Sequence, residues 1–325
     1  MTRGRCLAAA TLVFCLSLSP TAASAARGGQ ARIGEAPGPC DRACLNGFVD
    51  DYLDAMVAHD ASRVAIADGA KFVENLEVLD FDEGLWATAT GAPDDFRIYV
   101  PDPVSRQIGF IGIVEEGDTL VQLALRLKIE NDEITEAEHL IARNVSRASF
   151  GTPRPGLGAI VPPEERTPRE FMLMIGNSYY DALVQSNSEL TPFADACERR
   201  ENGNVTGGGT GLGRGGQPRP GCAAQIDTRA FSYIESIDLR RVWIADVEYG
   251  LVFGLSMFRH PLDKEGGYPT IGPDGQIQER TMNFNPFDLP AAHIFRIREG
   301  KVYEIEAMGF TAPLYSYNGW SDFLW

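Results

Sequence analysis

Two stretches of the chain align with each other without a gap. Residues 52–75 read YLDAMVAHDASRVAIADGAKFVEN, and residues 179–202 read YYDALVQSNSELTPFADACERREN. A second similarity pairs LKIENDEITEAE at 127–138 with FRIREGKVYEIE at 295–306, so the offset grows and the second copy carries insertions. Internal similarity of this kind indicates a repeated structural unit. Identical pairs include Tyr52 and Tyr179, Asp54 and Asp181, and Glu74 and Glu201.

Each copy begins with a helix and continues into strands. Residues around 48–59 and 175–183 recur at helical spacing, and a short second helical piece is expected at 62–69 and 189–196. Turn residues such as Glu116-Gly117-Asp118 separate the later strands into antiparallel hairpins. Helices followed by an antiparallel sheet form an α+β unit with helices on one face. The expected strands cover 72–79, 95–100, 108–115, 119–130 and 134–143 in the first copy, and 229–247, 249–259, 291–299 and 301–311 in the second.

This order of elements resembles the NTF2-like (SnoaL-like, ketosteroid-isomerase-like) family. The opening Cys40-Asp41-Arg42-Ala43-Cys44-Leu45, with Gly84-Leu85-Trp86 and Gly319-Trp320, is similar to secreted tandem SnoaL-like proteins of bacteria and fungi. The resemblance implies an α+β fold of two tandem cones, each with helices packed on a curved antiparallel sheet around a pocket. It does not fix an activity, because this fold hosts several enzyme classes and plain binding modules. The expected organisation is a signal peptide at 1–25, an N-terminal segment at 26–45, a first domain at 46–147, a linker at 148–168, and a second domain at 169–325 with a Gly-rich insertion (203–222) and a Pro-rich one (259–288).

The N-terminus has the layout of a secretory signal peptide. Arg3 and Arg5 precede an apolar run at 6–19, and small residues lead to Ala25. The run is shorter than the roughly 20 residues that a membrane span needs, so we expect a secreted or periplasmic protein.

Four cysteines remain after removal of the signal, and four cysteines allow three pairings. Export makes disulfides the expected state, and proximity favours Cys40–Cys44 and Cys197–Cys222. A four-cysteine zinc site is the alternative, but the C-x2-C pairs typical of such sites are absent.

The composition excludes several partners. The formal charge is −16, from 45 acidic and 29 basic residues, which argues against nucleic acid and against anionic lipid. We expect a small-molecule ligand, no nucleic acid, no membrane after signal cleavage and no cofactor, and a homodimer stays open. The absence of a G-x-S-x-G motif disfavours a common secreted hydrolase.

Histidines supply the first candidates for chemistry. In PAAHIFRIREG, alternation places His293 on a face with Ala291 and Phe295, with Arg296 and Arg298 marking a solvent face. Histidine is the side chain most readily used for proton transfer near neutral pH. The other candidates are His260, which closes a strand before Pro261, and His139, which faces either a cavity wall or a packed core.

Carboxylates and aromatics supply the second set. Glu201 aligns with Glu74, and Asp246 could act as a carboxylate base in an apolar site, with Tyr249 or Tyr233 as hydroxyl donor. The alternative for Asp246 is a solvated strand face paired with Arg240 and Arg241. The aromatics Trp243, Tyr249, Phe287, Trp320 and Trp86, together with His139, are the binding candidates, either at a cavity mouth or in packing between domains.

Three possible roles follow from these residues. The first is a secreted cofactor-independent lyase, isomerase or dehydratase, in which His293 acts as acid or base with Glu201, Asp246 or His260 in the cavity of the second domain. The second is a non-catalytic secreted module that binds a small molecule in the same pocket, and a structural role with one degenerate cone is a third. The discriminating observation is whether His293 faces a cavity and reaches a carboxylate or a tyrosine.

Overall fold

The computed structural model describes residues 40–320, apart from 144, 214–215 and 273. The expected signal peptide at 1–25 and most of the segment at 26–45 therefore lie outside the described residues. None of the helices in the described residues is long and apolar enough to cross a membrane.

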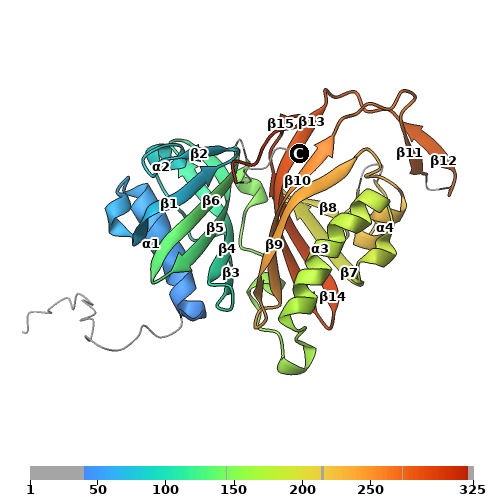
Figure 1. Ribbon diagram of the computed structural model, residues 1–325. Coiled ribbons are helices and arrows are strands. Elements are labelled where there is room, and N and C mark those ends of the chain that lie inside the picture. Colours follow the sequence, from blue (N-terminus) through green and yellow to red (C-terminus); the bar gives the residue numbers. More distant parts are fainter. Residues whose placement is uncertain (1–39, 144, 214–215, 273, 321–325) are drawn as a thin grey trace, which may run out of the picture. The chain divides into compact units, whose positions relative to one another are not determined.

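The first half of the described chain forms one six-stranded sheet with a long helix against it (Figure 1). Asp41 caps the helix by accepting a hydrogen bond from the Cys44 backbone N–H, at 3.0 Å. The strand order is β2-β1-β6-β5-β4-β3. The elements are α1 (Arg42–Val57), β1 (Ile66–Glu74), β2 (Glu77–Leu79), α2 (Leu85–Thr88), β3 (Arg97–Asp102), β4 (Gln107–Glu116), β5 (Thr119–Glu130) and β6 (Glu133–Arg143).

The second half forms a second sheet of comparable order, β8-β7-β14-β13-β10-β9, with β15 paired to β13. Its long helix α3 spans Arg169–Gln185, and β11 and β12 pair only with each other. Three 3-10 turns at Arg147–Ser149, Pro155–Gly158 and Pro163–Glu165 lie in the segment expected as a linker. The remaining elements are β7 (Phe193–Glu201), β8 (Asn204–Gly207), α4 (Cys222–Asp227), β9 (Ser236–Asp246), β10 (Leu251–His260), β11 (Tyr268–Ile271), β12 (Ile277–Arg280), β13 (Phe287–Arg298), β14 (Lys301–Gly309) and β15 (Ala312–Pro313).

Several expected elements differ from those observed. The sheets are mixed rather than antiparallel, because β1 pairs parallel to β6 and β7 pairs parallel to β14. The second helical pieces at 62–69 and 189–196 are single 3-10 turns, Ala61–Arg63 and Ser188–Leu190, followed by the strands β1 and β7. The strand expected at 229–247 begins only at Ser236, after helix α4 and a turn region. Parallel pairing joins segments far apart in sequence, so local periodicity does not reveal it.

Both faces of each sheet are covered, and this explains the long apolar strands. One apolar cluster joins α1 to the first sheet, another joins α3 and α4 to the second, and a third contains residues of both sheets. Along β4, Ile108 and Phe110 belong to the first cluster, whereas Ile111 belongs to the third. Close contact between the sheets requires Gly109, because a Cβ there would lie 2.2 Å from Cγ of Phe253.

The predicted disulfides are confirmed. Cys40 bonds to Cys44 at the start of α1, and Cys197 on β7 bonds to Cys222 at the start of α4. The second bond therefore attaches the Gly-rich insertion to the strand from which it departs.

Candidate active site in the second sheet

A cavity of about 260 Å³ lies between the second sheet and the elements packed on it. Its lining comes from α3, β7, β10, β13, β14 and the segment at 231–234. Most of the lining is apolar, with a few polar side chains directed into it, which is the usual character of a small-molecule site. The polar and titratable lining residues are Tyr179, Arg199, Glu201, Asn202, Tyr233, His260 and His293.

His293 lines this cavity, as the alternation along β13 predicts. Its side chain is buried, and Nδ1 lies 3.3 Å from the hydroxyl of Tyr180. Burial lowers the pKa of His293 to about 3, and the charge of Arg199 lowers it further in the same direction. The imidazole is therefore neutral near pH 7. The discriminating observation is met, since His293 faces a cavity and reaches a tyrosine.

The opposite face of β13 is not a solvent face. Ile294 belongs to the apolar cluster shared by the two sheets. Arg296 is buried and donates hydrogen bonds to the carbonyl oxygens of Ala159, at 2.9 Å, and Tyr249. Arg296 therefore does not mark a solvent face, whereas the Arg298 side chain at the end of the strand is 39% exposed and pairs with Glu165 at 3.0 Å.

His260 lies at the edge of the same cavity. Its ring stacks on that of Phe287 with centroids 4.2 Å apart and an interplanar angle of 10°. Burial lowers the pKa of His260 to about 4, so this imidazole is also neutral near pH 7. Its Nδ1 is buried and has no hydrogen-bond partner among the described residues.

Arg199 is the cavity residue that sequence reasoning missed. Its side chain is only 2% exposed, and Nη2 donates to Oε1 of Gln225 at 2.7 Å. Nε donates to Oγ1 of Thr206 at 3.1 Å and lies 3.3 Å from Oε1 of Glu201. The signal was present, because alternation along β7 places Arg199 on the same face as Cys197 and Glu201.

Tyr179 connects the buried cation to the cavity. Nη1 of Arg199 donates to the hydroxyl of Tyr179 at 3.2 Å, and no other hydrogen bond of this hydroxyl occurs among the described residues. Burial raises the pKa of Tyr179 although Arg199 opposes the shift. The phenol therefore stays protonated, and its O–H is available to a ligand.

Asp246 and Tyr249 do not line the cavity, whereas Tyr233, the other expected partner of Asp246, does. The Asp246 carboxylate forms an ion pair of 2.8 Å with Arg42 and accepts the backbone N–H groups of Glu248 and Tyr249. The alternative, in which Asp246 pairs with Arg240 and Arg241, is also wrong. Arg240 pairs with Asp181 at 2.7 Å, and Arg241 pairs with Glu138.

The remaining aromatic candidates are distributed over the molecule. Trp243 is exposed, and the ring of Tyr249 lies under the guanidinium of Arg42 at 3.6 Å. Trp320 contacts the cations of Lys71 and Arg126 on the first sheet, so it packs between the halves rather than at the cavity. Of the predicted binding aromatics, Phe287 alone contributes to the cavity lining.

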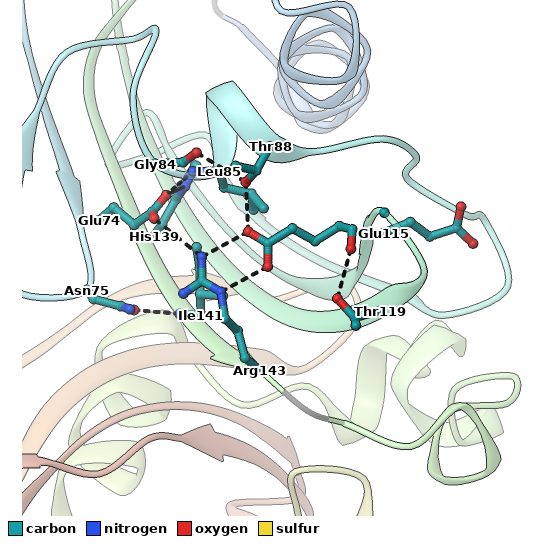
Figure 2. A network of polar contacts seen from close by, with 12 residues as sticks. Glu74, Asn75, Gly84, Leu85, Thr88, Glu115, Thr119, His139, Ile141 and Arg143 are labelled. Atoms are coloured by element: carbon teal, nitrogen blue, oxygen red, sulfur yellow. Dashed lines mark hydrogen bonds and ion pairs between the residues drawn. The ribbon is translucent and has the colours of Figure 1, made fainter.

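His139 and Trp86 belong to a packed core in the first sheet. Nε2 of His139 lies 2.9 Å from the hydroxyl of Tyr52, which also accepts the indole N–H of Trp86 at 2.9 Å. Figure 2 shows Glu74 between His139 and the backbone of Leu85, at 3.3 and 2.8 Å. Tyr52 aligns with Tyr179, but here tryptophan and histidine satisfy the hydroxyl. His139 therefore lies in a packed core and does not face a cavity wall. Neither His139 nor Trp86 lines the cavity of the second sheet.

No metal site is formed by the part of the chain that the structure describes, where no group of three or more His, Cys, Asp or Glu could hold a metal ion. The cavity presents an arginine, two neutral histidines, tyrosines and one carboxylate. This set suits hydrogen bonding and proton transfer to a small organic molecule.

Comparison with known proteins gives one family match and several structural ones. The family model, a domain of unknown function (DUF8021), matches residues 165–309, which is less than half of the chain but includes most of the cavity. No curated protein matches the sequence.

The solved structures that resemble this chain include NTF2-like proteins. A protein provisionally described as a polyketide cyclase from Silicibacter sp. TM1040 is 14% identical, with a TM-score of 0.27 over 43% of this chain and 90% of its own. One provisionally described as a SnoaL-like polyketide cyclase from Jannaschia sp. CCS1 is 16% identical, with a TM-score of 0.26 over 47% and 91%. An NTF2-like protein of unknown function from Burkholderia xenovorans LB400 is 11% identical, with a TM-score of 0.26 over 48% and 97%. Similarity at this level says nothing of activity, so function rests on the site itself.

Proposed function

We propose that the cavity of the second sheet is the active site of a cofactor-independent isomerase, lyase or dehydratase that acts on a small, partly apolar metabolite. The observation that carries the proposal is the buried Arg199–Tyr179 pair, which lines the cavity together with neutral His293 and whose phenolic O–H donates to none of the described residues. Donors fixed in a water-poor pocket stabilise charge that develops on a substrate oxygen.

The proposed chemistry is abstraction of a proton from a carbon next to a carbonyl group. The carbonyl oxygen gains negative charge as the proton leaves, and the Tyr179 hydroxyl donates to that oxygen. Arg199 strengthens this donor because it already holds the phenol oxygen at 3.2 Å. Return of the proton at another carbon completes an isomerisation, and loss of a leaving group completes an elimination, so neither outcome needs an oxidant or a reductant.

The structure changes the role proposed for His293. A base with a pKa of about 3 is a weak proton acceptor at neutral pH. A neutral imidazole is instead a good hydrogen-bond donor, and in the tautomer that accepts a hydrogen bond from Tyr180 at Nδ1 the proton lies on Nε2. Glu201 is the carboxylate in the lining, and we assign it the role of base.

The wider organisation belongs to the same proposal. We propose two tandem NTF2-like domains at 46–147 and 169–325, joined at 148–168, in a secreted or periplasmic protein with a cleaved signal. Two sheets of comparable strand order support the first statement, and two disulfides are compatible with an oxidising compartment. The first domain serves as a scaffold, since Trp86 and His139 occupy its core.

Proton exchange tests the proposal directly. The purified chain is incubated in D2O with a panel of small enolisable ketones and acids, and NMR follows the loss of protons next to the carbonyl. Catalysed exchange is expected, with a loss of at least tenfold in Tyr179→Phe and in Glu201→Gln.

Tyr52→Phe is the matched control, because it removes the aligned hydroxyl from the core of the first sheet and leaves the cavity intact. Equal exchange by wild type and both cavity variants would refute the mechanism. Ligand binding without exchange on any compound would identify the chain as a binding module instead.

A further inference from the structure

A row of nearly parallel rings begins at Phe295 in the apolar core and continues along one wall of the cavity to its edge. The rings of Phe295, His293, Phe258, His260 and Phe287 follow one another on the same face of β10 and β13. Successive centroids lie 5.7, 5.7, 6.5 and 4.2 Å apart, with interplanar angles of 7°, 21°, 8° and 10°. The rings that line the cavity extend along β13 from His293 to Phe287. Such a wall fits an elongated ligand better than a compact one.

Arg199 lies toward the inner end of this wall. The strand register pairs Arg199 with Ile305, and Ile305 with Phe295, whereas Phe287 pairs with Pro313 at the opposite end of β13. A guanidinium carries five N–H donors. The partners among the described residues are Thr206 and Glu201 at Nε, Tyr179 at Nη1 and Gln225 at Nη2. One N–H on each Nη atom is therefore left for a ligand.

The outer end of the wall leads into an apolar groove. Tyr233 and Phe287 line both the cavity and a groove of about 580 Å³ whose other lining residues include Met282 and Phe284. The side chain of Phe284 is 65% exposed. The two spaces therefore follow one another, with a cation at one end and exposed apolar side chains at the other.

We propose that the ligand of this site is an elongated amphipathic carboxylic acid, with its carboxylate at Arg199, its body along the ring wall and its apolar end in the groove at Phe284. This inference rests on the site of the proposed function and names its substrate class. A carboxylate accepts two parallel N–H donors from an arginine, which suits the free donors of both Nη atoms.

The negative charge of Glu201 repels an anionic ligand. Its carboxylate lies 3.3 Å from Nε of Arg199, but its side chain is 45% exposed, so solvent screens it. The Glu201 carboxylate contacts Nε of Arg199, so both Nη atoms remain for a ligand carboxylate. Because the two carboxylates would repel each other, Glu201→Gln is expected to tighten the binding of an acid and to leave the binding of a neutral analogue unchanged.

Titration calorimetry with straight-chain probes tests the inference on the full chain. Hexanoate, decanoate and dodecanoate are compared with the methyl esters and alcohols of the same length. The acids are expected to bind at least tenfold more tightly than the esters, and affinity is expected to rise about two- to fourfold per added methylene until the groove is filled. Arg199→Lys should reduce the preference for acids at least threefold, because lysine lacks the planar fork.

Phe284→Ser provides a variant whose folding is not in question, since the side chain is exposed. It should weaken dodecanoate several-fold and leave hexanoate unchanged. Esters or alcohols that bind as tightly as the acids would overturn the inference, and so would an equal effect of Phe284→Ser on short and long chains. Proton exchange distinguishes the two proposals. Acids that bind but do not exchange protons would refute the catalytic function alone. Exchange on neutral ketones, without a preference for acids in binding, would refute the substrate class alone.

Discussion

Removal of the disulfide between Cys197 and Cys222 is expected to destabilise the protein more than removal of the one between Cys40 and Cys44. The bonds join cysteines 25 and 4 residues apart. In the chain-entropy description, closing a loop of the first size contributes about 3.5 kcal/mol, and closing one of the second size about 2 kcal/mol. The expected difference in the free energy of unfolding is therefore about 1.5 kcal/mol.

The same bond positions a partner of the buried cation. Cys222 begins α4, and Gln225 on that helix accepts the 2.7 Å hydrogen bond from Arg199. Loss of the bond should loosen α4 and weaken the binding of an acidic ligand as well as lower stability. Removal of the bond between Cys40 and Cys44 should lower stability without weakening the binding of an acidic ligand, because this bond lies at the start of α1.

The assay compares Cys197→Ala/Cys222→Ala with Cys40→Ala/Cys44→Ala by urea unfolding without reductant, followed by calorimetry with decanoate. Alanine is preferred to serine because Cys197 and Cys222 are buried in an apolar cluster. Equal losses of stability, or a larger loss for the pair at 40 and 44, would refute the loop-entropy reasoning. Unchanged decanoate affinity in the first variant would refute the positioning of Arg199 through α4.

Three further predictions concern buried charges. Because the pKa of His293 is lowered to about 3 by burial, the folded state binds fewer protons than the unfolded state, and its stabilising contribution is full above pH 6.5 and is lost as the pH falls toward 3. His293→Gln should remove about 3 kcal/mol of this acid sensitivity in urea titrations between pH 7 and 4, and an unchanged slope would contradict the assignment. Burial raises the pKa of Glu306 to about 7 although Arg154 opposes it, so stability is full below pH 4.5 and declines as the pH rises to 7. Glu306→Gln should therefore gain up to about 3 kcal/mol relative to wild type above pH 7, and a variant that is less stable there would show that the ion pair outweighs burial. Asp102 is fully buried and pairs with Arg169 at 2.6 Å, so Asp102→Asn should lower the free energy of unfolding by about 3 kcal/mol. A double-mutant cycle with Arg169→Gln should return most of that value as coupling energy. Additive effects of the two substitutions would contradict a direct pair.

Much of the site could be predicted from sequence because strands alternate. Alternation along β13 placed His293 on the face of Phe295, and alignment of the repeat drew attention to Glu201. Arg199 was accessible by the same reasoning, two residues before Glu201. It was overlooked because an arginine beside other charged residues usually indicates a solvated strand, and its burial depends on α3 and α4 packing over β7.

Other features could not be predicted, since they depend on distant partners. Asp246 looked like a cavity carboxylate, but Arg42 lies more than 200 residues earlier and holds it outside the cavity lining. The protonation states of His293 and His260 follow from burial, which no spacing in the sequence reports. His139 and His293 are both strand histidines, yet one is satisfied by Tyr52 and the other faces a cavity.

The sequence by itself determined the order of the long helix and the strands in each half and the inward face of β13, and it favoured the two cysteine pairs without fixing them, because these features depend on periodicity and short separations. Only the tertiary structure decided that a cavity with buried polar side chains lies against the second sheet. In the first sheet Trp86 donates to Tyr52 and fills the core, whereas in the second Arg199 holds Tyr179 and leaves its proton free. The two tyrosines align, and their different roles arise from the side chains that packing brings beside them.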